Sequence, residues 1–216
     1  MPENLFETRY DLTKKSKLRE FYESNKILIY SSIITLIIIF ASYSYYQVSK
    51  ERKKILLSEN YIQAKIYLES GNKTEALEIL KKVIFSNDPT YSTLSFFMIL
   101  NENLVNDNNE VSRLFDYLLE NNKFDKEIRN LLLYKKALHK SNYVDELKLL
   151  AETKPLLNNE ESVWRAHALL LLGDFYFSRK EYIKAKDFYI QTLSIKNLHP
   201  DLYVQANSRL AFIADD

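Results

Sequence analysis

The three histidines are the side chains of this sequence best suited to acid–base or metal chemistry near neutral pH. His139, His167 and His199 lie far apart along the chain, and no pair has the i, i+4 spacing that places two metal ligands on one helix face. We therefore interpret them as structural or surface residues and predict no metal site. The lack of cysteine also excludes disulfides, thiol catalysis and thiolate ligands.

The other residues with catalytic potential form no known catalytic pattern. Two isolated glycines, Gly71 and Gly173, cannot build a phosphate-binding loop. The sequence contains neither a G-x-S-x-G nor an H-E-x-x-H motif, and its carboxylates are scattered along lysine-rich segments. A net charge of +1 argues against a nucleic-acid partner. We predict a protein that is not an enzyme, with no cofactor, no nucleic acid and no small-molecule substrate.

An uncharged apolar segment, residues 27–48, lies between Lys26 and Lys50. At about 1.5 Å per helical residue it reaches roughly 33 Å, enough to cross a hydrocarbon core of about 30 Å. A cleaved signal peptide has a shorter apolar core of about 7–15 residues. We therefore predict a transmembrane anchor over 27–48, preceded by a short charged segment over 1–26 and followed by a helical domain over 49–216.

The charges beside this segment favour one orientation only slightly. The basic residues counted on the N-terminal flank are Lys14, Lys15, Lys17, Arg19 and Lys26, and those on the C-terminal flank are Lys50, Arg52, Lys53 and Lys54. Because loops rich in lysine and arginine stay in the cytoplasm, the small excess before the segment favours a cytoplasmic N-terminus.

Residues 49–216 show the apolar periodicity of helices and no alternating pattern of strands. Low usage of glycine and proline, 2 and 4 residues, also favours helices. The predicted helices cover 57–68, 74–84, 90–104, 110–120, 126–140, 143–152, 161–178, 182–194 and 201–213. We expect Thr74 to cap the second helix, and Pro89, Pro155 and Pro200 to lie between helices. Evenly spaced helices with short loops are typical of an α-solenoid.

Two segments of the sequence align with each other. The aligned positions are Ala64, Tyr67, Gly71, Ala76 and Leu80 in the first, and Gly173, Tyr176, Lys180, Ala185 and Tyr189 in the second. The pattern resembles the tetratricopeptide repeat, in which small residues let the two helices of a hairpin approach closely. We expect Gly173 and Ala185 to form this contact, with Tyr176, Tyr182 and Tyr189 filling the space beside it.

The layout of the whole chain resembles one family, the single-span, periplasmic, tetratricopeptide-like ancillary subunits of the Sec translocon in Gram-negative bacteria. Residues 6–46 match the head of those proteins, and residues 164–193 and 200–213 match their last repeat and Pro-started final helix. The resemblance implies a single-pass protein of the bacterial inner membrane with a cytoplasmic N-terminus and a periplasmic helical domain. It also implies Sec translocon subunits, periplasmic chaperones or client polypeptides as partners.

The repeat register predicts a protein-binding groove lined by the inner helix of each hairpin. The candidate groove residues are Tyr61, Lys65 and Leu68 in the first repeat and His167, Leu170, Asp174 and Phe177 in the last. The alternative is that these side chains stack against the neighbouring repeat. Trp164, the only tryptophan, is either a binding anchor or a core residue.

Two functions are consistent with these features. The first is a membrane-anchored protein-binding scaffold or co-chaperone of the bacterial envelope, which associates with the Sec translocon and assists secreted or envelope proteins. The alternative is a structural coordinator that holds a cell-envelope or division assembly together. Crosslinking in membranes separates the two, because it recovers translocon subunits in the first case and assembly components in the second.

Overall fold

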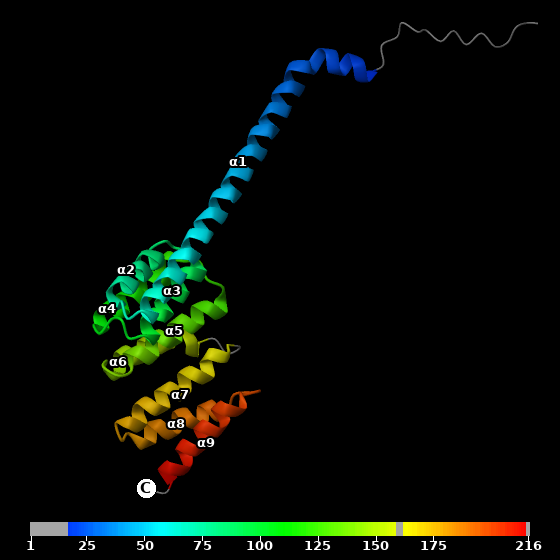
Figure 1. Cartoon of the computed structure of the whole chain (residues 1–216). Coiled ribbons are helices and arrows are strands. Elements are labelled where there is room, and N and C mark those ends of the chain that lie inside the picture. The colour runs from blue at the N-terminus through cyan, green and yellow to red at the C-terminus, as the bar shows by residue number, and fades with distance from the viewer. Residues whose placement is uncertain (1–16, 159–161, 215–216) are drawn as a thin grey trace, which may run out of the picture. The chain divides into compact units, whose positions relative to one another are not determined.

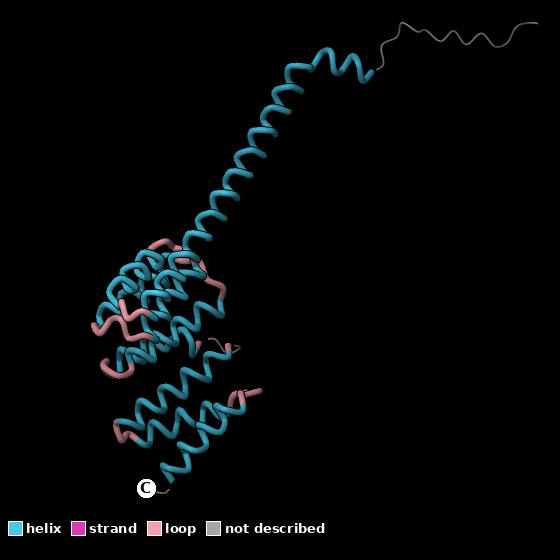
Figure 2. Tube along the Cα trace, in the orientation of Figure 1, coloured by secondary structure: helices cyan, strands magenta, loops and turns pink. Residues whose placement is uncertain are grey.

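The computed structural model describes residues 17–158 and 162–214, and all regular structure in these ranges is helical (Figures 1 and 2). The helices are α1 (Lys17–Glu69), α2 (Lys73–Ile84), α3 (Pro89–Asn101), α4 (Asn108–Asn121), α5 (Lys126–Lys140), α6 (Glu146–Leu157), α7 (Val163–Ser178), α8 (Tyr182–Leu193) and α9 (Pro200–Ala214). The predicted all-α class is therefore confirmed for the described residues. Each helix predicted between residues 57 and 213 has a counterpart.

The first helix is long because residues 17–69 contain no glycine or proline. It ends where Gly71 adopts a φ of 82° and the N–H of Asn72 donates to the carbonyl of Tyr67. The chain divides into two units, residues 1–56 and 57–216. Because residues 49–56 are exposed and Leu57 is the first buried residue of α1, the helical domain predicted from residue 49 begins as a packed unit at Leu57.

Short polar side chains start five of the helices. The capping residues are Asp88, Asp107, Asp125, Asp145 and Ser162, and each accepts a hydrogen bond from a backbone N–H in the first turn of the helix that follows. Pro89 and Pro200 occupy the first positions of α3 and α9 rather than the loops before them. A missing N–H costs no helical hydrogen bond at that position.

Two other predictions about helix ends are wrong. Thr74 lies inside α2, which Asn72 precedes without a side-chain cap, because the turn at Gly71 brings the chain directly into the helix. Pro155 lies inside α6 rather than after it. Its ring removes one intrahelical hydrogen bond, but the helix continues because Leu156 is fully buried.

Neighbouring helices of residues 57–216 pack against one another. α5 contacts α6, α7 contacts α8, and α7 also contacts α5 and α9. The core has two clusters. One surrounds Phe96 and Phe115, whose rings meet edge to face at 4.5 Å. The other surrounds Leu172 and Tyr189 and is formed mainly by α7, α8 and α9.

The contact between α7 and α8 depends on Gly173. A Cβ atom at this position would lie 2.6 Å from Cδ1 of Tyr189. This distance is shorter than a van der Waals contact, so a side chain at residue 173 would force the ring to move. Ala185 and Tyr189 are fully buried beside it, and Tyr176 is nearly so. The close approach of α7 and α8 predicted at Gly173 is therefore confirmed, and the group that meets the glycine is the ring of Tyr189.

Candidate protein-binding surface

The groove residues predicted in α1 differ in exposure. Lys65 is exposed, whereas Tyr61 and Leu68 are partly buried. The ring of Tyr61 lies 6.5 Å from the ring of Tyr91 in α3, and it packs on the core cluster of Phe96. Tyr61 therefore joins neighbouring helices, as the alternative interpretation expects.

Leu170 has no place in a groove. It is 6% exposed and belongs to the core cluster around Tyr189, so its prediction as a groove residue is wrong. The reason is that every residue from 168 to 173 is buried. In a helix covered on most of its sides, apolar periodicity does not single out an exposed face.

The side chains of Asp174 and Phe177 contact α8 and α9. One carboxylate oxygen of Asp174 accepts hydrogen bonds from the Tyr189 hydroxyl at 2.7 Å and from Nε of Arg209 at 3.1 Å. The ring of Phe177 lies 5.5 Å from that of Phe212. Both predicted groove residues are partly buried. They join α7 to α8 and α9, and part of each side chain remains exposed to solvent.

His167 belongs to a group of three rings that we call the aromatic patch: Tyr134 of α5, and Trp164 and His167 of α7. The ring centroids are 5.6 Å apart for Tyr134 and Trp164, 5.3 Å for Tyr134 and His167, and 5.2 Å for Trp164 and His167. All three side chains are partly exposed. In this patch three mutually contacting rings from two helices include a predicted groove residue.

Two carboxylates act on the aromatic patch. Glu127 is the second residue of α5. Its Oε2 accepts a hydrogen bond from Nε1 of Trp164 at 3.0 Å. Burial raises the pKa of the Tyr134 hydroxyl, and the negative charge of Asp174 raises it further. Burial lowers the pKa of His167, and the nearby His199 lowers it further.

The sequence prediction missed Tyr134 and Glu127. A signal for them exists, because Glu127, Leu131, Tyr134 and Leu138 follow the i, i+4, i+7, i+11 pattern of one helix face. None of the four is fully buried. What the sequence does not contain is the pairing of α5 with α7, which brings this face beside Trp164.

The remaining histidines have separate environments. The ring centroid of His139 lies 6.3 Å from that of Phe115 and 5.3 Å from that of Tyr143, and burial lowers the pKa of His139. His199 is exposed, with Nδ1 at 3.6 Å from a carboxylate oxygen of Asp201. Within residues 17–158 and 162–214, no three histidine or acidic side chains lie close enough to hold a metal ion.

Two shallow hollows lie elsewhere on the helical unit. One, of about 340 Å³, is lined by Lys81, Phe85, Glu110, Arg113, Leu114 and Tyr117 on α2 and α4. The other, of about 410 Å³, is lined by Lys186, Ile190, Asn207, Leu210, Ala211 and Ile213 on α8 and α9. Apolar surface predominates in both hollows, and in the first Nζ of Lys81 pairs with Oε1 of Glu110.

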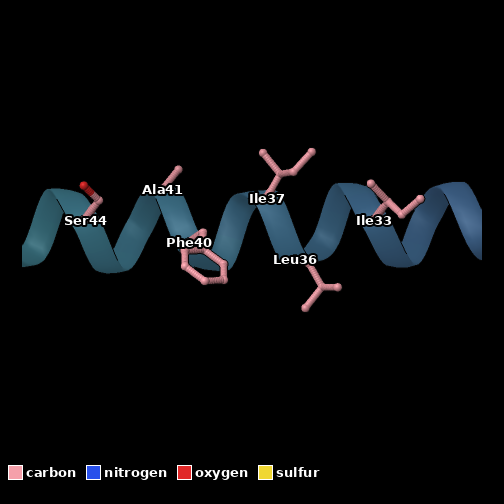
Figure 3. Close-up of a pocket in the computed structure, with 6 residues that line it drawn as sticks. All are labelled: Ile33, Leu36, Ile37, Phe40, Ala41 and Ser44. Atoms are coloured by element: carbon pink, nitrogen blue, oxygen red, sulfur yellow. The ribbon is translucent and has the colours of Figure 1, made fainter.

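α1 supplies a different kind of functional element. Within the described residues it is the one helix long and apolar enough to cross a membrane, and no residue of its most apolar window is buried. Ile33, Ile37, Ala41 and Ser44 project to one side of it (Figure 3). The hydroxyl of Thr35 donates to a carbonyl of the same helix at 2.8 Å, so this polar group needs no outside partner in a bilayer.

The chain was compared with protein-family models, with curated proteins and with solved structures, and none of them matches it. The proposed function therefore rests on the residues and their geometry.

Proposed function

We propose that this protein is a membrane-anchored protein-binding scaffold. The observation that supports this most strongly is the apolar stretch of α1, in whose most apolar window no side chain is buried. An exposed apolar surface of that length is unfavourable in water and favourable in a bilayer. The helices beyond it then form a module held at the membrane surface, where a partner is captured by contact rather than converted by chemistry.

The helical unit is proposed to be a tetratricopeptide-like solenoid. Supporting this, α5 and α7 each pack with the helix that follows them and also with each other, and α7 packs with α9. Such packing places alternate helices side by side, as in stacked hairpins. The glycine-dependent approach of α7 and α8 at Tyr189 supports the same repeat register.

We assign the scaffold to the bacterial inner membrane, with its helical unit in the periplasm. The proposed partners are Sec translocon subunits, periplasmic chaperones or client polypeptides, as the resemblance in the sequence implies. The alternative remains a coordinator of a cell-envelope or division assembly. The partly exposed rings of the aromatic patch support protein binding in either case, because Trp and Tyr are enriched at the centres of interfaces.

Crosslinking in native membranes tests the function. We expect a photoreactive amino acid at Lys65 or at the exposed Leu138, four residues after Tyr134 on α5, to crosslink to translocon subunits or to exported polypeptides. Recovery of division or outer-membrane assembly components would favour the alternative. A chain that gives no crosslink from any exposed position of α5 or α7 would contradict a scaffold function.

A topology reporter tests the location. Alkaline phosphatase fused after Asp216 is expected to be active, because the enzyme folds only outside the cytoplasm. A green fluorescent protein fused at the same position serves as the complementary reporter and is expected to be dark after Sec-dependent export. The opposite pair of results would place the helical unit in the cytoplasm and overturn the proposed partners.

A further inference from the structure

We propose that the aromatic patch binds a lysine or arginine side chain from a polypeptide partner. This inference rests on the proposed scaffold function and specifies the chemistry of the partner. It is carried by three rings in mutual contact, by the carboxylate of Glu127 at their edge and by the way this chain places its own cations elsewhere.

The rings provide the surface for a cation. Tyr134, Trp164 and His167 lie with centroids 5.2–5.6 Å apart, and each keeps part of its surface exposed. A cation within about 6 Å of the centroid of an aromatic ring is attracted by the electrons of the ring face, and Trp is the best partner. A side chain lying on the patch would reach more than one of these rings.

The charges around the patch favour a positive group. Oε2 of Glu127 is held by Nε1 of Trp164 at 3.0 Å, which fixes the carboxylate beside the indole and leaves Oε1 with no hydrogen bond to another described residue. Asp174 of α7, which pairs with Nε of Arg209 at 3.1 Å, raises the pKa of Tyr134. The carboxylate that a cation on the patch would meet is therefore that of Glu127.

The chain fills comparable positions with its own cations. The guanidinium of Arg179 lies 3.7 Å from the ring centroid of Phe175, and Nζ of Lys184 lies 4.9 Å from that of Tyr176. Arg209 lies 6.0 Å from Phe177. These three cations lie over rings outside the aromatic patch, and the rings of the patch keep part of their surface exposed for a cation from a partner.

The only tryptophan of the chain makes the test direct, because the emission of Trp164 reports on the patch alone. The full-length protein in detergent micelles is titrated with two extended peptides that differ at one central residue, arginine or citrulline. Citrulline keeps the shape of arginine and removes its charge. We expect the arginine peptide to shift the emission saturably and to bind about three- to tenfold more tightly than the citrulline peptide.

Variants locate the interaction. Glu127→Gln retains an oxygen for the indole N–H and removes the charge, so it should weaken binding of the arginine peptide about three- to tenfold while leaving citrulline binding unchanged. Tyr134→Leu should weaken binding of the arginine peptide as well. Glu120→Gln, an exposed carboxylate on α4, is the matched control and should change nothing. Circular dichroism melting of each variant checks that the fold is intact.

Three results would overturn the inference. Equal affinity for the two peptides would mean that the occupant is an uncharged or apolar side chain. Equal affinity of the wild type and of Glu127→Gln would remove the carboxylate from recognition, and no emission change with either peptide at millimolar concentration would make the patch purely structural. If Glu127→Gln leaves the membrane crosslinks unaltered, only this inference fails, whereas a complete lack of crosslinks would contradict the scaffold function itself.

Discussion

At the scale of single residues, Gly173 has the clearest physical role. It lies where α7 meets α8, and any side chain there collides with the ring of Tyr189. That ring is fully buried, and its hydroxyl donates to Asp174 at 2.7 Å. The ring therefore cannot rotate away without leaving a buried polar group unpaired.

Substitution of this glycine should destabilise the fold. We expect Gly173→Ala to lower the free energy of unfolding by about 1–3 kcal/mol, and Gly173→Leu by more, because a well-packed core tolerates extra atoms poorly. Thermal unfolding followed by circular dichroism measures the loss.

A double-mutant cycle provides the control for this prediction. Tyr189→Leu removes the ring that an alanine methyl would meet. The double variant Gly173→Ala, Tyr189→Leu should therefore lose less free energy of unfolding than the two single variants lose together. Strict additivity would show that the glycine and the tyrosine do not share one contact.

At the scale of elements, an ionic network joins α4, α5 and α6. Nζ of Lys136 lies 2.7 Å from Oδ1 of Asp116 and 2.9 Å from Oε2 of Glu152, and Lys140 lies 2.5 Å from the other oxygen of Glu152. Burial alone would raise the pKa of Glu152, but hydrogen bonds from Lys140 and Lys136 hold it below its ordinary value. Burial alone would lower the pKa of Lys136, but hydrogen bonds to Asp116 and Glu152 raise it.

These opposite pKa shifts define a pH window of stability. Glu152, with a lowered pKa, stabilises the folded state above about pH 5 and loses this effect as the pH falls through its folded pKa. Lys136, with a raised pKa, stabilises it below about pH 10 and loses this effect as the pH rises through its folded pKa. Stability should therefore be greatest between these limits.

The pH dependence can be assigned to the network by substitution. Glu152→Gln should lower stability at pH 7 by about 1 kcal/mol and should flatten the acid limb of a plot of melting temperature against pH. Glu120→Gln, which removes an exposed carboxylate of α4, should leave that limb steep. An acid limb unaltered by Glu152→Gln would mean that other carboxylates control acid unfolding.

At the scale of the whole molecule, the two units should be separable. Deleting residues 1–48 removes the apolar segment and leaves Leu57 and Ala64 of α1, which are buried in the helical unit. We expect the remaining protein to be soluble and almost wholly helical, with a cooperative thermal transition. A product with substantial strand content by circular dichroism, or one that does not fold, would show that the span contributes to the core.

The sequence by itself determined the helical class, the apolar segment and nearly all helix positions, because these depend on local pattern and on the residues at helix ends. It also indicated the approach at Gly173 and Ala185, since small residues at repeat spacing let two helices of a hairpin pack closely. It failed at Pro155, where the burial of Leu156 outweighs the local cost of proline.

Only the tertiary structure decided which side chains border the candidate site. Leu170 lies in the core and Phe177 packs on Phe212, although both carry the same helical signal as an exposed groove residue. Tyr134 and Trp164 meet because α5 packs beside α7, a contact between segments about thirty residues apart that no local period encodes. Helix faces follow from the order of residues, whereas the partner of each face follows from how all the helices share one core.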